Sequence, residues 1–190
     1  LIASLISVPA AILLAAVILP PDDGADDAPI DLQSPYISSM DALVSGMLVL
    51  ARTSKAADRL TKQFQSGAVE KTYWALVERP PGPAEAELSD WVVKSERDQR
   101  MTIVPARTRG ARQARLSYRT LRQEKFGTLL EVQLHTGRKH QIRLQLASIG
   151  CPIVGDRKYG GHKAFLPDAI GLHCVRLAFE HPTTKERLEF

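Results

Sequence analysis

Cationic side chains are concentrated in one short stretch of the chain, residues 136–143, whose sequence is TGRKHQIR. Within six residues this stretch carries Arg138, Lys139, His140 and Arg143. A mostly apolar run follows and ends in a Gly-Asp-Arg-Lys-Tyr-Gly motif that starts at Gly155. Guanidinium and ammonium groups clustered in this way bind an anion. The anion could be a phosphate of a ligand or a carboxylate of the protein itself.

A helix is predicted over residues 138–149, because apolar side chains recur there at helical spacing and Gly150 would end it. The apolar positions are Ile142, Leu146 and Ile149. Lys139, His140 and Arg143 are three and four residues apart, so they would share a second face beside the apolar one. At the edge of the core, Arg143 would need a carboxylate or phosphate partner. The alternative is an arginine in contact with water.

Two further residues could take part in chemistry. Asp41 precedes a predicted turn at Ser45-Gly46 and an apolar run, and an acid at the end of a buried strand is a common place for a catalytic carboxylate. A loop aspartate that only binds backbone amides is the alternative. Tyr73 and Trp74 should point to opposite sides of one strand. One of them would face the core, and the other could stack on a base or simply pack at the rim.

The elements that must position these residues are short strands and few helices. Apolar or alternating runs predict strands at 43–51, 71–78, 87–93, 100–105, 114–121, 127–135, 172–179 and 186–190. A helix should follow Thr53 or Ser54 as N-cap and stop at Gly67. The short intervals between strands favour antiparallel pairing. We therefore expect an α+β fold, a mixed, largely antiparallel sheet with a few flanking helices, in a single domain over residues 1–190.

Charge is distributed unevenly along the chain. Residues 1–50 hold six Asp and no Lys, Arg or Glu, whereas residues 51–190 hold all 25 basic residues and 15 of the 21 acidic ones. The excess of positive charge favours a polyanionic partner such as nucleic acid, although a soluble enzyme with a basic surface would also fit. Two cysteines, Cys151 and Cys174, provide no disulfide framework and no metal-ligand spacing, which is typical of a cytoplasmic protein.

The first 20 residues contain no charge, which is the length of a membrane span. Pro9 interrupts the segment and basic residues are missing at its start. Its Val, Ile and Leu clusters at 12–14 and 17–19 are also typical of buried strands. We therefore predict strand and core for residues 1–20, and a membrane anchor is the alternative.

Three segments, taken in order, resemble the RluA-type family of RNA pseudouridine synthases over residues 41–190. The first is Asp41-Ala-Leu-Val-Ser-Gly46 with the MLVLARTSKAADRLTKQF that follows it, and the second is Lys71-Thr-Tyr73-Trp-Ala75. The third is residues 136–143, followed by Gly155-Asp156-x-x-Tyr159-Gly160, Leu172-His173 and His181-Pro182. Residues 1–40 lack this similarity.

The resemblance implies isomerisation of specific uridines in RNA to pseudouridine. Asp41 would be the nucleophile, Tyr73 would stack on the uracil and accept the C5 proton, and Arg143 would pair with Asp41 at the floor of a basic cleft. RNA, ribosomal or transfer, would contact the basic residues Arg138, Lys139, His140, Lys71, Arg157 and Lys158. No metal or other cofactor is implied, and we expect a cytoplasmic monomer that does not bind membranes.

The sequence departs from the family at two places. Ser38-Ser39-Met40 stand where the family has His-Arg-Leu, and Gln145 stands where it has His. The missing arginine is one expected to help displace the target base. A non-catalytic RNA-binding relative of the synthases is therefore the alternative to an active isomerase.

Overall fold

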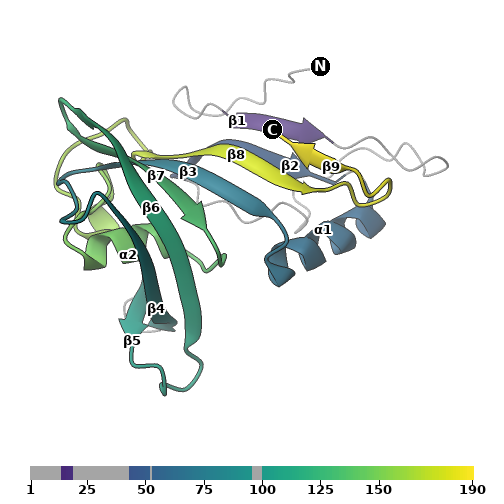
Figure 1. Cartoon of the computed structure of the whole chain (residues 1–190), viewed down its shortest axis with the longest axis horizontal. Helices are drawn as coiled ribbons and strands as arrows, with labels where there is room; N and C mark the ends of the chain where they lie inside the picture. The colour runs from purple at the N-terminus through teal and green to yellow at the C-terminus, as the bar shows by residue number, and fades with distance from the viewer. Residues whose placement is uncertain (1–13, 19–42, 52, 96–99) are drawn as a thin grey trace.

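The computed structural model describes residues 14–18, 43–51, 53–95 and 100–190 (Figure 1). Within these residues the fold is one mixed sheet with two α-helices and one short 3₁₀ turn, so the α+β prediction is confirmed. The strands are β1 Leu14–Ile18, β2 Ser45–Leu50, β3 Glu70–Val77, β4 Glu85–Ser95, β5 Arg100–Val104, β6 Arg112–Glu124, β7 Gly127–Leu134, β8 Leu172–Glu180 and β9 Arg187–Glu189. The helices are α1 Ser54–Ser66, α2 Gln141–Ser148 and the 3₁₀ turn η1 Arg157–Tyr159.

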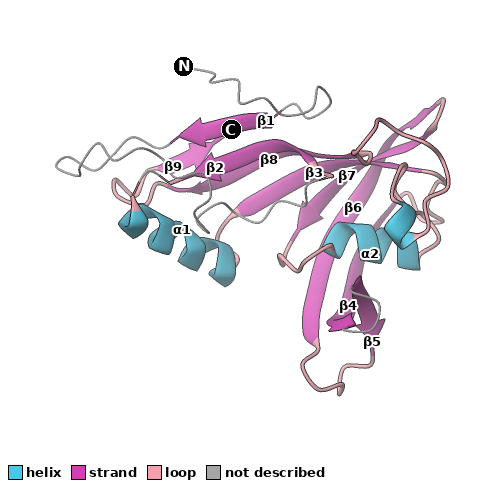
Figure 2. Ribbon diagram, turned by 180° about the vertical axis from the view of Figure 1, so that it is seen from behind, coloured by secondary structure: helices cyan, strands magenta, loops and turns pink. Residues whose placement is uncertain are grey.

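The sheet has the strand order β1-β2-β8-β3-β7-β6-β4-β5, and β9 pairs with β8. The pairs β1–β2 and β2–β8 are parallel, and the other pairs are antiparallel, as the short intervals between strands predicted. Figure 1 shows the β4, β5 and β6 strands projecting from the rest of the sheet, and we call residues 85–124 without 96–99 the arm. Both helices lie on the same side of the sheet (Figure 2).

Helix α1 forms where its predicted signals lie. The Thr53 side chain accepts a hydrogen bond from the Ala56 N–H at 3.2 Å, which caps the first turn. At the other end, Gly67 has a φ of 80° and donates its N–H to the Gln63 carbonyl. Leu60 is buried against the sheet in a cluster with Val69, Leu177 and other apolar side chains. The helix thereby closes one side of the space beneath the sheet.

The turn predicted at Ser45-Gly46 is wrong, since both residues lie in β2 and pair with His173 and Cys174 of β8. Gly46 has a φ of 116°, and a Cβ placed there would lie 2.4 Å from the backbone nitrogen of Cys174. Only glycine allows the two strands to approach this closely. The glycine therefore marks a close strand contact and not a chain reversal.

Helix α2 begins three residues later than the sequence predicted, so the basic face expected from Lys139, His140 and Arg143 does not exist. His140 has a left-handed backbone with a φ of 54° and is the N-cap, and Lys139 precedes the helix. The Gln141 side chain holds the preceding turn, because its Oε1 accepts from the Arg138 N–H at 2.9 Å and from the Thr136 hydroxyl at 2.7 Å. These contacts replace the first helical turn.

Part of the apolar N-terminal segment is a strand, as predicted. β1 pairs in parallel with β2 along its full length, from Leu14 opposite Gly46 to Ile18 opposite Leu50. No helix in the described part of the chain combines the length and the apolarity needed to cross a bilayer. The remainder of the prediction for residues 1–20 lies outside the described residues. Because most of residues 1–42 lie outside the described part of the chain, a single catalytic domain over residues 1–190 stays a prediction.

Candidate active site

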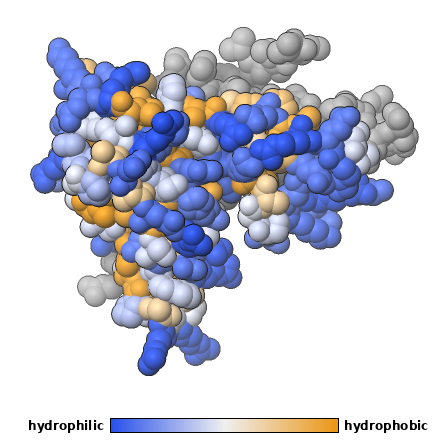
Figure 3. Space-filling model, viewed as in Figure 1, coloured by the Kyte–Doolittle hydropathy of each residue, from blue (hydrophilic) through white to orange (hydrophobic). Residues whose placement is uncertain are grey.

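A cavity of about 1210 Å³ opens beneath the sheet, between α1 and the start of α2. Figure 3 shows the molecule hollowed between the arm and the part that carries α1. The basic residues that line the cavity are Lys71, Arg112, Arg138, Lys139 and Arg143, together with His135 and His140. No Asp or Glu is found among the described residues of its wall. The cavity is therefore suited to an anionic ligand.

Arg143 lies in the wall of this cavity and forms a buried ion pair with Asp156. Its Nε and Nη2 each donate to one carboxylate oxygen of Asp156 at 2.7 Å. The two side chains are only 3% and 1% exposed. Arg143 was expected to need a carboxylate or phosphate partner, and within the described residues Asp156 provides a carboxylate that holds the arginine in a fixed orientation.

Tyr159 braces the same pair from the 3₁₀ turn η1. Its ring lies under the Arg143 guanidinium, with 5.0 Å from the Cζ atom to the ring centroid. The hydroxyl accepts the backbone N–H of Met101 at 3.1 Å and lies 2.9 Å from Nδ1 of His140. Burial raises the pKa of Tyr159 above its ordinary value. The arm, the start of α2 and Arg143 are thereby connected through one phenol.

Tyr73 faces the cavity, whereas Trp74 points to the other side of β3 and is 43% exposed. Tyr73 is half-buried and packs against the main apolar core of the sheet. Burial, with a smaller contribution from the neighbouring Cys174, raises the pKa of Tyr73 well above its ordinary value. The hydroxyl therefore keeps its proton at neutral pH.

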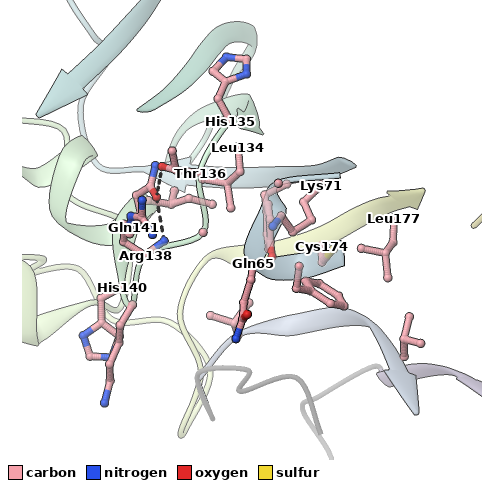
Figure 4. A pocket seen from close by; sticks show the side chains of 18 of the residues that line it. Gln65, Lys71, Leu134, His135, Thr136, Arg138, His140, Gln141, Cys174 and Leu177 are labelled. Carbon is pink, nitrogen blue, oxygen red and sulfur yellow. Dashed lines mark hydrogen bonds between the residues drawn. The ribbon is translucent and has the colours of Figure 1, made fainter. Parts of the chain in front are cut away.

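Lys71 lies on the same strand and also lines the cavity, opposite Arg138, His140 and Gln141 (Figure 4). The residue is buried, at 8% exposed, and its Nζ lies 5.4 Å from the centroid of the Phe64 ring. Burial lowers the pKa of Lys71 below its ordinary value. Lys71 was predicted as an RNA contact and does line the cavity, but its burial could not be recognised from the sequence.

The other predicted RNA contacts are only partly brought together. Arg138, Lys139 and His140 line the cavity, and Arg138 is anchored by a 2.9 Å hydrogen bond from its Nε to the Gln113 carbonyl. Arg157 and Lys158 are exposed residues of η1 and do not belong to the cavity wall. A role for these two in RNA contact would require RNA that extends beyond the cavity.

Asp156, Tyr159 and Gln141 are the residues whose structural roles the sequence did not predict. The Gly-Asp-x-x-Tyr-Gly pattern was a signal for Asp156 and Tyr159. It did not show that Asp156 would pair with Arg143, which lies 13 residues earlier in the chain. Gln145 is fully buried and donates to the Asp90 carboxylate of β4 at 2.7 Å. Gln145, which stands where the family has a histidine, thus connects α2 to the arm through this hydrogen bond.

Asp41 is not among the residues that the structure describes, and neither are Ser38, Ser39 and Met40. The predicted Asp41–Arg143 ion pair therefore lies outside the described residues. Val44, three residues further along the chain, is buried and lines the cavity.

The wall of this cavity thus combines basic side chains with the Tyr73 phenol and the Lys71 ammonium group. Comparison with known proteins assigns the family. The model of the RNA pseudouridylate synthase family matches residues 35–148, which include Asp41, Tyr73 and Arg143. The chain belongs to the RNA pseudouridylate synthase family, and the resemblance derived from its motifs is confirmed.

The chain is similar to several curated relatives. It is 40% identical over 167 residues to an uncharacterized RNA pseudouridine synthase of Chloroflexus aurantiacus, covering 84% of this chain and 50% of that protein. It is 34% identical to ribosomal large subunit pseudouridine synthase D of Zymomonas mobilis, covering 81% and 50%. It is 33% identical to tRNA pseudouridine synthase C of Vibrio cholerae, covering 78% and 68%. The chain thus spans about half the length of the first two.

A solved structure supports the fold. Human RNA pseudouridylate synthase domain containing 1 superposes with a TM-score of 0.65 at 23% identity, covering 80% of this chain and 65% of that one.

Proposed function

We propose that the chain isomerises uridine in RNA to pseudouridine, with Asp41 as nucleophile. The observation that carries this proposal is Arg143, a buried and rigidly held guanidinium in the wall of a basic cavity. A guanidinium has five N–H donors, so it has the capacity to orient a second carboxylate besides Asp156. Asp41 is the candidate because it precedes the cavity residue Val44 by three positions and falls within the family match.

In the proposed reaction, the Asp41 carboxylate adds to the target nucleotide at C1′ of the ribose or at C6 of the uracil. The bond between N1 and C1′ breaks, the uracil turns, and a bond forms between C5 and C1′, while the bond to the Asp41 oxygen breaks and restores the free carboxylate. C5 then loses its proton, while N1 ends with a proton. Atoms balance within one nucleotide. The target must leave the base stack to enter the cavity, as in other enzymes that modify bases.

We assign Tyr73 to contact with the uracil and to acceptance of the C5 proton. The raised pKa means that no phenolate exists beforehand at neutral pH, so the hydroxyl must give up its own proton as it accepts the one from C5. N1 of the turned uracil, which ends with a proton, is the acceptor that the reaction supplies. The substrate we propose is ribosomal or transfer RNA, which are the substrates named for two of the relatives.

The proposal is tested by incubating the protein with cellular RNA that carries tritium at C5 of uridine. Release of tritium to water, with pseudouridine mapped in the product RNA, is the expected result. A protein that binds RNA but releases no tritium from ribosomal or transfer RNA would instead be a non-catalytic RNA-binding relative. That second function is favoured by Ser38-Ser39-Met40 in place of the family's His-Arg-Leu.

Tyr73→Phe is expected to lower turnover by about 10²–10⁴-fold, because the ring remains but the proton-accepting oxygen is lost. RNA affinity should stay within about twofold, since stacking needs only the ring. The parent rate should not rise between about pH 7 and pH 9 through this residue, because the raised pKa keeps the hydroxyl protonated over that range. The checks are tritium release and filter binding at fixed salt. Full turnover by Tyr73→Phe would exclude the proton-acceptor role.

A further inference from the structure

The outer part of the arm is rich in arginine and poor in acid. Residues 100–123 contain seven Arg and no Asp or Glu. Three of these arginines pair with carboxylates of neighbouring strands or turns, namely Arg115 with Glu87, Arg119 with Glu131 and Arg122 with Glu124. Arg107, Arg109 and Arg112 are exposed, and no carboxylate in the described part of the chain pairs with them. Their charge is therefore available to a partner from outside the chain.

Two of the three arginines lie in the turn between β5 and β6. We call this turn, residues 105–111, the arm tip, because it forms the outer end of the arm (Figure 1). The Thr108 N–H donates to the Pro105 carbonyl at 3.0 Å, and the Ala111 N–H donates to the Thr108 carbonyl at 3.0 Å. Gly110 has a φ of 79°, which lets the chain reverse there. Backbone hydrogen bonds thus hold the turn that presents the arginine side chains.

The third arginine, Arg112, connects the arm tip with the cavity. It begins β6 and lines the cavity wall. A segment of five residues spans at most about 17 Å, so Arg107 and Arg109 both lie within that distance of Arg112 along the chain. Figure 3 shows hydrophilic side chains at the end of the arm. A polyanion that enters the cavity can therefore extend to the arm tip, where positive charge attracts it.

The residue types of the arm tip favour the backbone of a double helix over unpaired bases. Proteins that bind single-stranded RNA combine basic residues with aromatic side chains on which the bases stack. Residues 100–117 contain no Phe, Tyr, Trp or His. Double-stranded RNA is instead recognised by its shape and by contacts with its phosphates and ribose hydroxyls. Guanidinium groups suit such contacts, because they bind phosphate through two parallel hydrogen bonds.

From these observations we infer that the arm tip is a second RNA-binding surface, at which Arg107 and Arg109 bind phosphates of a double-stranded stem next to the target uridine. This inference rests on the proposed function, since it takes RNA as the partner. It also narrows the class of substrate, because the unpaired uridine would enter the cavity while the adjoining stem lies against the arm. The family resemblance assigned no RNA contact to these two arginines.

The test replaces both residues, as Arg107→Gln with Arg109→Gln, and measures binding to two RNA probes. One probe is a hairpin with a uridine loop and a stem of about ten base pairs, roughly one helical turn, and the other is a single strand of uridines. For the hairpin, affinity at fixed salt should fall about tenfold or more, and the slope of log K against log salt should become shallower by about 1.8, or about 0.9 for each phosphate contact. For the single strand, affinity should stay within about twofold of the parent. Tm should be unchanged, because both side chains are exposed.

Arg119→Gln with Arg122→Gln is the matched control, since it removes the same charge from exposed β6 residues that already pair with Glu131 and Glu124. Its affinity for the hairpin should stay within about twofold of the parent. An equal loss in the control would overturn the inference, because only the net charge would then matter. Equal losses for the hairpin and the single strand would overturn the contact with a stem. Unchanged hairpin binding by the arm-tip variant would overturn the surface as a whole.

Tritium release separates this inference from the proposed function. With a tritiated hairpin, the arm-tip variant should show a higher KM and an unchanged kcat, because the stem is bound equally in the ground state and in the transition state. Weaker hairpin binding by the variant, in a protein that releases no tritium, would refute the proposed isomerase and leave the arm-tip surface standing. Tritium release with the same hairpin affinity in variant and parent would refute the arm-tip surface alone.

Discussion

Asp41→Asn is expected to abolish tritium release from uridine, with a loss on the order of 10⁴-fold or more, as removal of a nucleophile does in other enzymes. The amide is nearly the same size as the carboxylate, so the fold should survive, but an amide nitrogen and carbonyl cannot attack the nucleotide. RNA affinity should stay within a few-fold of the parent or increase slightly. Removing a negative charge near the phosphates of the RNA does not weaken electrostatic binding.

Asp58→Asn is the matched control for Asp41→Asn. Asp58 is an exposed α1 residue whose carboxylate pairs with Lys62 on the same helix, outside the cavity wall. Its turnover should equal that of the parent. Asp41→Asn at the parent rate would disprove the assignment of the nucleophile, whatever the affinity for RNA. Loss of RNA binding together with turnover would point instead to a folding defect, which circular dichroism and Tm would detect.

Local sequence patterns predicted most of the secondary structure but not the way in which strands far apart in the sequence meet. Apolar or alternating runs indicated the strands from β3 to β7, and the caps of α1 were visible as Thr53 and Gly67. The parallel contact of β2 with β8 joins Gly46 to Cys174, and nothing within either segment indicates the other. The local sequence around Gly46 therefore predicts a turn, whereas the residue makes a close contact between strands.

The start of α2 shows that sequence patterns can also miss contacts between residues close together in the chain. Helical spacing placed Lys139 and His140 in the helix, but the Gln141 side chain binds the Arg138 amide and the Thr136 hydroxyl instead. A side chain that competes for backbone hydrogen bonds in this way cannot be read from periodicity.

The sequence predicted which residues would line the candidate site better than it predicted which residues they would contact. Arg143 and Tyr73 do line one cavity, as a cleft built from the motifs requires. A carboxylate or phosphate partner for Arg143 was predicted from its place at the edge of the core, but the partner within the described residues, Asp156, lies on a separate segment. Burial of Lys71 depends on α1 packing beneath β3, which is a property of the assembled fold.

Asp156→Asn is expected to destabilise the protein by about 3–5 kcal/mol, since it leaves the buried Arg143 without the carboxylate that now binds it at two points. For a chain of this size, the loss corresponds to a Tm lower by roughly 10 °C. The exposed Asp58–Lys62 pair provides the contrast, because both of its side chains are more than half exposed. Asp58→Asn should cost at most about 0.5 kcal/mol.

A double variant separates the effect of Asp156 on stability from its effect on the site. Arg143→Met combined with Asp156→Leu removes both charges, and apolar replacement of a buried ion pair is often neutral or stabilising. Its Tm should therefore recover most of what Asp156→Asn loses. Tritium release should nevertheless stay at background, because the guanidinium proposed to orient Asp41 is gone. Recovery of both stability and turnover in the double variant would show that the pair only fills space, and that Arg143 has no part in positioning the nucleophile.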